Sequence, residues 1–139
     1  MGILKHVVLP LFCIWHVGAI VLATTQGKEG LANAAKFPRG SNADLTQMEL
    51  HFLGSFVGIS LALLLNDLSA ILTENSHYRA MATAVELVII ATDAFDGLYL
   101  SGQGFDTTVP IVLSVLAVVG LVIHSMEPGI LTKDRHKND

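Results

Sequence analysis

The chain has 139 residues, of which 52% are apolar and only 14% are charged, and its mean hydropathy is +0.59. Soluble domains usually carry about 25% charged residues, so the composition argues against a soluble protein and predicts one integral membrane domain over residues 1–139. The formal net charge of −4 is small and not clustered, so no nucleic-acid partner is expected.

Four apolar segments are long enough to cross a hydrocarbon core of about 30 Å, which takes about 20 helical residues. They cover approximately residues 4–23, 47–72, 78–100 and 107–126. The first is interpreted as a retained helix, because its apolar run is long for a signal peptide. A polar loop over 24–46 separates the first two segments, and short turns join the others. The pattern predicts an all-α integral membrane protein, an antiparallel four-helix bundle with both termini on one side.

Basic residues are slightly more numerous on the side of the termini than on the opposite side. Those predicted on the terminal side are Lys5, Arg79, Lys133, Arg135 and Lys137. By the positive-inside rule, this bias places the termini in the cytosol. The last five residues, "RHKND", resemble an endoplasmic reticulum retrieval signal, which predicts residence in that membrane. An ordinary basic flanking tail is the alternative.

Polar residues interrupt the first two helices. The first helix carries Trp15 and His16 just past its midpoint. On the second, small or polar residues recur at helical spacing on one face, namely His51, Ser55, Gly58, Ala62 and Ser69, with Asn66 beside them. Such residues usually face other helices in lipid, and the Gly54/Gly58 pair is therefore also a candidate surface for a homo-oligomer. Packing does not explain His51.

Acidic residues interrupt the third helix, in "VELVIIATDAFDG". An Asp at a helix centre costs roughly 2.5–3.5 kcal/mol on insertion, so intramembrane acids are functional candidates. Glu86 and Asp93 are seven positions apart, which is about two turns, so both are expected on one face. Asp96 lies nearer the helix end, where it binds substrate or sits at the interface. On the second helix, Asp67 is expected to be a solvated residue near the headgroups.

These residues predict a polar cavity between the helices, open towards the long loop. Its candidate catalytic residues are His16, His51, Glu86 and Asp93. Its candidate substrate-binding residues are Trp15, Phe52, Ser55, Asn66, Tyr99 and Asp96. A carboxylic acid in an apolar pocket stays neutral and donates a proton, and a neutral histidine beside it accepts one. The combination suits acid–base chemistry on an uncharged, lipophilic small molecule.

Two other interpretations of the same residues are open. The acids bond histidine or serine on neighbouring helices and only fix the register of the bundle. Alternatively, two histidines and a carboxylate hold non-haem iron. The sequence contains no HxxxH spacing, and every ligand would come from a different turn or helix. No metal or other cofactor is therefore predicted.

In overall layout the chain resembles small four-helix membrane proteins of fungal secondary metabolism, in particular the quinolone epoxide rearrangement proteins. The residues that suit their task are Glu86 and Asp93 in "VELVIIATDAFDG", His51 in "MELHFLGSF" and His16 in "CIWHVG". The resemblance implies a cofactor-independent isomerase or cyclase that opens an epoxide on a prenylated natural product, an alkaloid or a terpenoid-bearing polyketide. Membrane-bound anthrone oxygenases have a similar layout, so an oxygenase of aromatic polyketides is the rival expectation. A non-catalytic membrane partner subunit is the third.

In the expected reaction, Asp93 or Glu86 protonates the epoxide oxygen, and the C–O bond breaks towards the more substituted carbon. An aromatic ring, such as Trp15, Phe52 or Tyr99, stabilises the cation by cation–π attraction. His16 or His51 then removes a proton. A dry cavity prevents hydrolysis of the epoxide to a diol.

Overall fold

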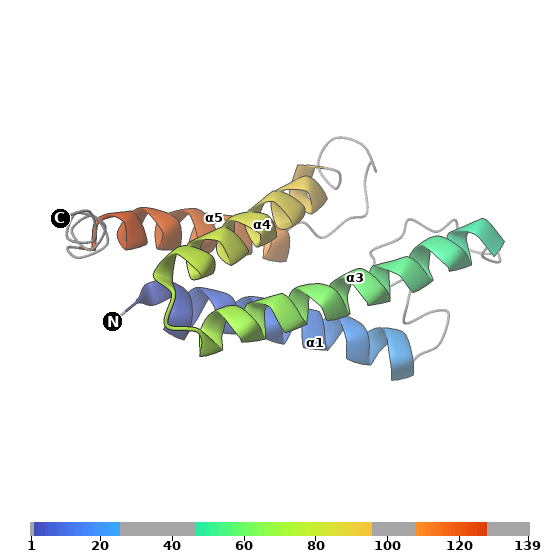
Figure 1. The fold of residues 1–139 in the computed structure, drawn as a ribbon. Helices are drawn as coiled ribbons and strands as arrows, with labels where there is room; N and C mark the ends of the chain where they lie inside the picture. Colours follow the sequence, from blue (N-terminus) through green and yellow to red (C-terminus); the bar gives the residue numbers. More distant parts are fainter. Residues whose placement is uncertain (1, 26–46, 96–107, 128–139) are drawn as a thin grey trace.

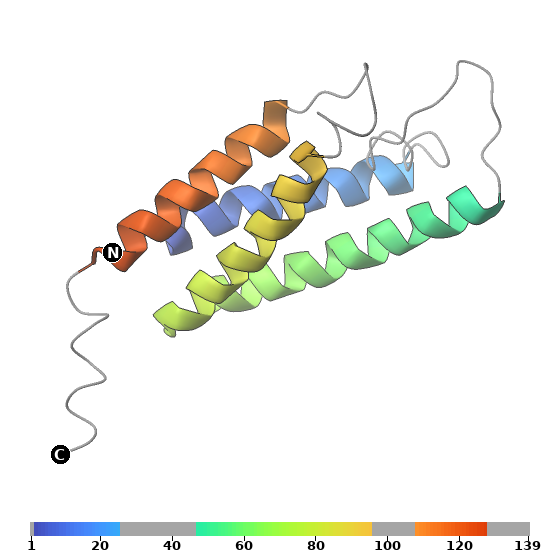
Figure 2. The ribbon, with the colours of Figure 1, turned by 90° about the horizontal axis from the view of Figure 1, so that it is seen from above.

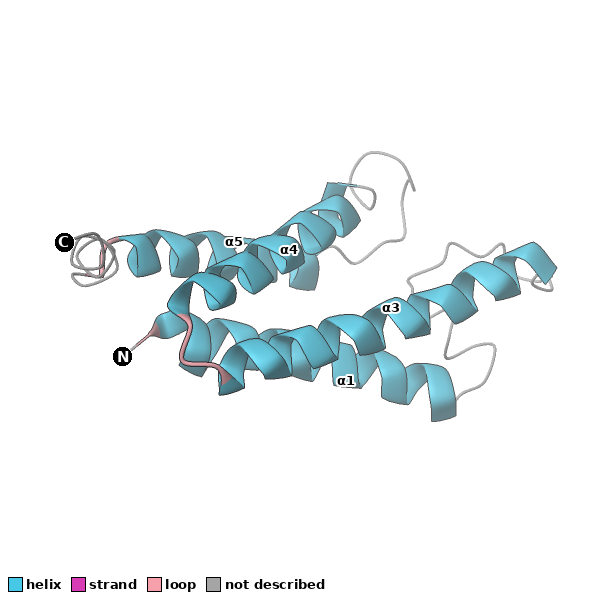
Figure 3. Ribbon diagram, viewed as in Figure 1, coloured by secondary structure: helices cyan, strands magenta, loops and turns pink. Residues whose placement is uncertain are grey.

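The computed structural model describes residues 2–25, 47–95 and 108–127, and within them the chain is helical apart from short turns (Figure 1). A π-helical turn, η1 (Leu4–Val8), continues directly into α1 (Leu9–Thr25). The other helices are α3 (Gln47–Leu72), α4 (Ser76–Phe95) and α5 (Thr108–Ser125). Figure 3 shows no strand in the described part of the chain. For the described residues, the predicted all-α class with four helices is confirmed.

Three of these helices are long and apolar enough to cross a membrane, at Leu4–Thr25, Gly54–Leu72 and Thr108–Met126. α4 is not among them, because Arg79, Glu86 and Asp93 interrupt its apolar sequence. The helix predicted over 78–100 begins earlier, at Ser76, and is described as far as Phe95. Residues 96–100 of that prediction lie outside the described residues.

The helices form two adjacent pairs, in which α1 packs along α3 and α4 packs along α5. η1 contacts α4 and α5, so it joins the two pairs at the N-terminal end of α1. Figures 1 and 2 both show α4 leaving the C-terminal end of α3 and running away from it towards α5. The hydrophobic core lies where η1 and α1 meet α4 and α5, and it contains Leu4, Val8, Phe12, Ile90, Leu113 and Ala117.

A short turn sets how α4 begins against α3, seen as the loop between them in Figure 3. The Asn75 side-chain oxygen accepts hydrogen bonds from the backbone N–H groups of His77 and Tyr78, at 3.0 and 3.1 Å. This is the geometry of an N-cap, which satisfies donors left free at a helix start. The Tyr78 hydroxyl donates to Asn66 Oδ1 on α3 at 3.0 Å. These bonds fix the start of α4, and with it the direction in which its inner face points.

Gly120 on α5 lies at a close helix crossing. A Cβ added there would be 2.7 Å from Val8 Cγ2 and 3.0 Å from Leu4 Cδ2, and both of these side chains are buried. By contrast, apart from its own helix backbone and chain neighbours, no described residue has an atom within 4 Å of a Cβ added at Gly54 or Gly58. These two glycines therefore do not mediate close packing against the described residues of the same chain. Self-association through their face stays a prediction.

We expect Gly120→Leu to lower the free energy of unfolding by about 1–3 kcal/mol, because a side chain forced into a packed interface displaces its neighbours. Equilibrium unfolding by SDS titration in detergent micelles, followed by circular dichroism, measures this. Gly58→Leu is the matched control, since the added side chain meets open space. Equal losses in the two variants would contradict the close crossing of η1 and α5.

Candidate functional site

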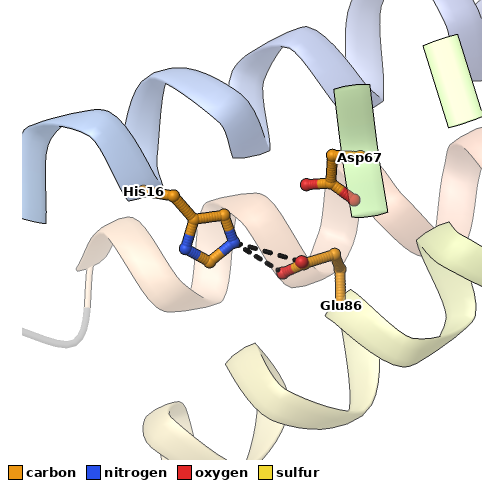
Figure 4. A group of neighbouring side chains, drawn as sticks. All are labelled: His16, Asp67 and Glu86. Atoms are coloured by element: carbon orange, nitrogen blue, oxygen red, sulfur yellow. Dashed lines mark hydrogen bonds and ion pairs between the residues drawn. The ribbon is translucent and has the colours of Figure 1, made fainter. Parts of the chain in front are cut away.

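A cluster of three polar side chains lies between α1, α3 and α4: His16, Asp67 and Glu86 (Figure 4). Only 4% of His16 is exposed, and both acids are fully buried at 0%. Each residue comes from a different helix, and each lies in a largely apolar stretch of sequence. A buried polar group of this kind must be satisfied by its neighbours or by a ligand.

Helical periodicity places the first and third members of the cluster inside. The buried residues of α1 recur every three or four positions, at Leu9, Phe12, His16, Ala19 and Ala23. On α4 the buried residues are Ala82, Thr83, Glu86, Ile90 and Ala94. Residues at these spacings form one stripe on a helix. His16 and Glu86 therefore lie on the stripes that face the other helices.

Glu86 binds His16 symmetrically. The Nε2 atom of His16 lies 3.1 Å from Glu86 Oε1 and 3.1 Å from Oε2, so one ring nitrogen serves both carboxylate oxygens. When this nitrogen carries a proton, it donates to the carboxylate. The pair links the α1–α3 half of the molecule to the α4–α5 half.

Asp67 completes the cluster without a hydrogen bond of its own. Neither of its carboxylate oxygens has a hydrogen-bond partner among the described residues. In Figure 4 its carboxylate points towards the space beside the Glu86 carboxylate and the His16 ring. One ligand atom from each of the three residues lies within 4.8 Å of the other two. In the cluster, His16 and Glu86 are therefore hydrogen-bonded to each other, whereas Asp67 has no hydrogen bond among the described residues.

The net charge of the cluster determines whether it can hold a proton or a cation. His16 supplies at most one positive charge, whereas the two acids supply two negative charges when both are ionised. An uncompensated buried charge costs several kcal/mol, and two carboxylates close together cannot both stay ionised without a counter-charge. The site must therefore hold a proton on a carboxyl group or bind a cation. A proton held on a carboxyl group makes the site a Brønsted acid, whereas a bound cation takes the place of that proton.

The structure brings together two of the four candidate catalytic residues, His16 and Glu86. His51 and Asp93 are exposed, so they do not belong to the buried cluster. The position of the buried residues on α4 explains why Asp93 is exposed. These residues follow steps of four along the helix, from Ala82 through Glu86 to Ala94. Such a row moves around a helix by about 40° per step. A face that runs parallel to the helix axis would include both Glu86 and Asp93. Because the buried row turns away from that line, Asp93 points outwards.

The candidate substrate-binding residues are dispersed. Trp15 is half-buried and packs against the hydrophobic core. Asn66 accepts the hydrogen bond from Tyr78, and exposed Ser55 donates to the His51 carbonyl oxygen at 3.1 Å. The side chain of Phe52, and the whole of Asp96 and Tyr99, lie outside the described residues.

Asp67 is the site residue that the sequence analysis missed. The expectation that Asp67 is solvated is wrong, since the residue is fully buried. The buried residues of α3 include Ser60, Asp67 and Ala70, whereas His51, Ser55 and Gly58 are exposed. The small and polar face was therefore not the inner face. The cost of an Asp in the apolar run "LALLLNDLSAIL" was the signal, and it applies to Asp67 as it does to Glu86.

Comparison with protein-family models, with curated proteins and with solved structures finds no match to this chain. The chemistry of the site therefore follows from its own side chains. Three features determine it: the buried acids, the His16 imidazole bonded to Glu86, and the Asp67 carboxylate without a hydrogen-bond partner among the described residues.

Proposed function

We propose that this chain is an integral membrane enzyme, an antiparallel four-helix bundle that rearranges a lipophilic substrate by acid catalysis. The reaction class is the opening of an epoxide on a prenylated natural product, followed by isomerisation or cyclisation. The observation that carries the proposal is the fully buried His16–Asp67–Glu86 cluster. It offers an acid and a base side by side in apolar surroundings, which is what such a reaction needs.

Asp67 is the proton donor in this mechanism, because its oxygens have no hydrogen-bond partner among the described residues. Its proton passes to the epoxide oxygen, which becomes a hydroxyl group as the C–O bond to the more substituted carbon breaks. The resulting cation loses a proton from a neighbouring carbon to the His16–Glu86 pair. Proton transfer within the cluster then restores Asp67. The product is an isomer of the substrate, and no oxidant or reductant is consumed.

The surroundings of the cluster suit a cationic intermediate. The core beside it is built from aliphatic and aromatic side chains, including Phe12 and half-buried Trp15. An aromatic ring stabilises a desolvated cation by about 2 kcal/mol. Exclusion of water prevents capture of the cation as a diol. The apolar faces of the candidate spans are consistent with a substrate that arrives from the bilayer.

We also propose residence in the endoplasmic reticulum membrane with both termini in the cytosol. The proposal rests on the basic residues near the termini and on the final "RHKND". Under the positive-inside rule, such residues mark the cytosolic side. Fluorescence microscopy of the full chain, with protease protection of a tag at either end, tests both parts.

The reaction is tested with membranes that contain the wild type or Asp67→Asn. Each is incubated anaerobically with a panel of prenyl-derived epoxides, and the products are followed by mass spectrometry. We expect an isomer of unchanged mass with the wild type and its loss in the variant, because the amide cannot supply the proton. A product heavier by one oxygen that forms only in air would replace the isomerase with an oxygenase of aromatic polyketides.

A non-catalytic role makes the opposite prediction. A membrane subunit that binds a partner through the Gly54/Gly58 face would lose its function in Gly58→Leu, because the added side chain alters an open surface. It would keep its function in Asp67→Asn. Including Gly58→Leu in the same series therefore separates the enzyme from the partner subunit.

A further inference from the structure

We propose that His16, Asp67 and Glu86 bind one divalent transition-metal ion, of the Zn²⁺ or Fe²⁺ type. The donor set is one imidazole nitrogen with two carboxylates, contributed by three different helices. Imidazole suits zinc and iron, and carboxylate oxygens complete many such sites. The sequence spacing gives no sign of this site, because the three residues are far apart along the chain.

The positions of the ligand atoms are close to those of a metal centre. They lie within 4.8 Å of one another. With bonds of about 2.0–2.2 Å, two atoms on one ion are at most about 4.4 Å apart. The separations therefore exceed this limit by at most about 0.4 Å, which movement of the side chains has to close when an ion binds. The His16 nitrogen and the Glu86 oxygens are already 3.1 Å apart, a separation that suits neighbouring ligands on one ion.

The unpartnered carboxylate of Asp67 is a second indication of a bound ligand, separate from the short distances between the three side chains. Both of its oxygens are buried and lack a hydrogen-bond partner among the described residues, and its carboxylate is turned towards the other two side chains (Figure 4). A buried acceptor left without a partner costs about 1–3 kcal/mol, and more when it is charged. A cation between Asp67 and Glu86 would satisfy these oxygens.

The charge balance selects a divalent ion. Two ionised carboxylates and a neutral imidazole carry two negative charges, which one divalent cation neutralises. Three protein ligands leave at least one coordination position open, as in catalytic metal sites. A monovalent ion would leave one charge uncompensated in an apolar interior, which is costly.

The ion and the proton compete for the same oxygens. Metal ligands must be deprotonated, so binding releases protons, and a loaded site has no Asp67 proton to give. The metal is therefore expected to inhibit the proposed rearrangement, and only this consequence rests on the proposed function. The binding of the ion itself does not.

The test uses the full chain purified in detergent micelles, with the affinity tag removed and bound metals stripped by EDTA and dialysis. Isothermal titration with ZnCl₂ measures the affinity and the number of ions bound, and the visible spectrum with CoCl₂ reports on the ligands. We expect one ion per chain and a loss of at least about 100-fold in affinity for Asp67→Asn, since even indirect support of a ligand is worth about 10–100-fold. Asp93→Asn, an identical change at an exposed position, keeps the wild-type affinity.

Helical content and elution volume show whether each variant folds. If Asp67→Asn does not, His16→Gln serves as the ligand variant, and it is also expected to lose at least about 100-fold in affinity. A wild-type protein that binds no Zn²⁺ or Co²⁺, or equal affinities for the wild type and a folded ligand variant, would overturn the metal site. The epoxide assay is run separately with and without ZnCl₂, so failure of the rearrangement leaves the binding result interpretable.

Discussion

The Glu86→Gln variant is expected to lose about 10²–10⁴-fold in the rate of the proposed rearrangement, the range for removal of a general acid–base group. The amide has nearly the size of the carboxylate and can still contact His16 Nε2, which lies 3.1 Å from both carboxylate oxygens. It cannot accept the proton that the histidine passes on. Single-turnover formation of the isomer in anaerobic lipid nanodiscs measures the rate.

The matched control for this variant is Asp93→Asn. It also converts an acid of α4 into its amide, but at an exposed position. We expect Asp93→Asn to keep most of the rate. A larger loss in Asp93→Asn than in Glu86→Gln would place the reaction on the outer face of α4, and the buried cluster would then be structural.

Much of the fold could be predicted from the sequence, because membrane helices are marked by the length of their apolar runs. The predicted segment 47–72 has the same bounds as α3, and the other three predicted helices differ from the structure at one or both ends. His16 and Glu86 could also be identified, since a polar side chain within an apolar run is costly unless another helix satisfies it. The two residues are indeed each other's partners.

The inner faces of α3 and α4 could not be predicted in the same way. In water, the apolar side of a helix faces the core. In a chain that spans a membrane, as we propose for this one, lipid is as apolar as the core, so hydrophobicity no longer distinguishes inside from outside. The small residues of α3 predict its inner face, yet Gly54 and Gly58 meet open space. The inner stripe of α4 follows a row that moves around the helix, which depends on how α4 crosses its neighbours. For these two reasons Asp67, which was expected to be solvated, is buried, and Asp93, which was expected in the cavity, is exposed.

Removing members of the cluster is expected to lower the free energy of unfolding, and by more for His16→Leu than for Glu86→Leu. In His16→Leu the two buried acids lose their histidine, and breaking a buried pair costs about 3–5 kcal/mol of unfolding free energy. In Glu86→Leu the histidine keeps Asp67 as a neighbour within 4.8 Å, so the expected loss is smaller. SDS titration of each variant in detergent micelles measures both losses.

The double variant His16→Leu with Glu86→Leu separates the interaction energy between the two side chains from the effect of removing each side chain alone. Replacing a whole buried pair with apolar residues is often neutral or stabilising, so the double variant is expected to be more stable than His16→Leu alone. A parallel cycle of His16→Leu with Asp93→Leu should be additive within about 0.5 kcal/mol, because exposed Asp93 does not belong to the buried cluster and independent sites add. Additivity in the His16/Glu86 cycle would mean that the two side chains do not stabilise each other. The bond between the helix pairs would then be too weak to hold Glu86 beside Asp67, and both the acid–base mechanism and the metal site would lose their shared geometric basis.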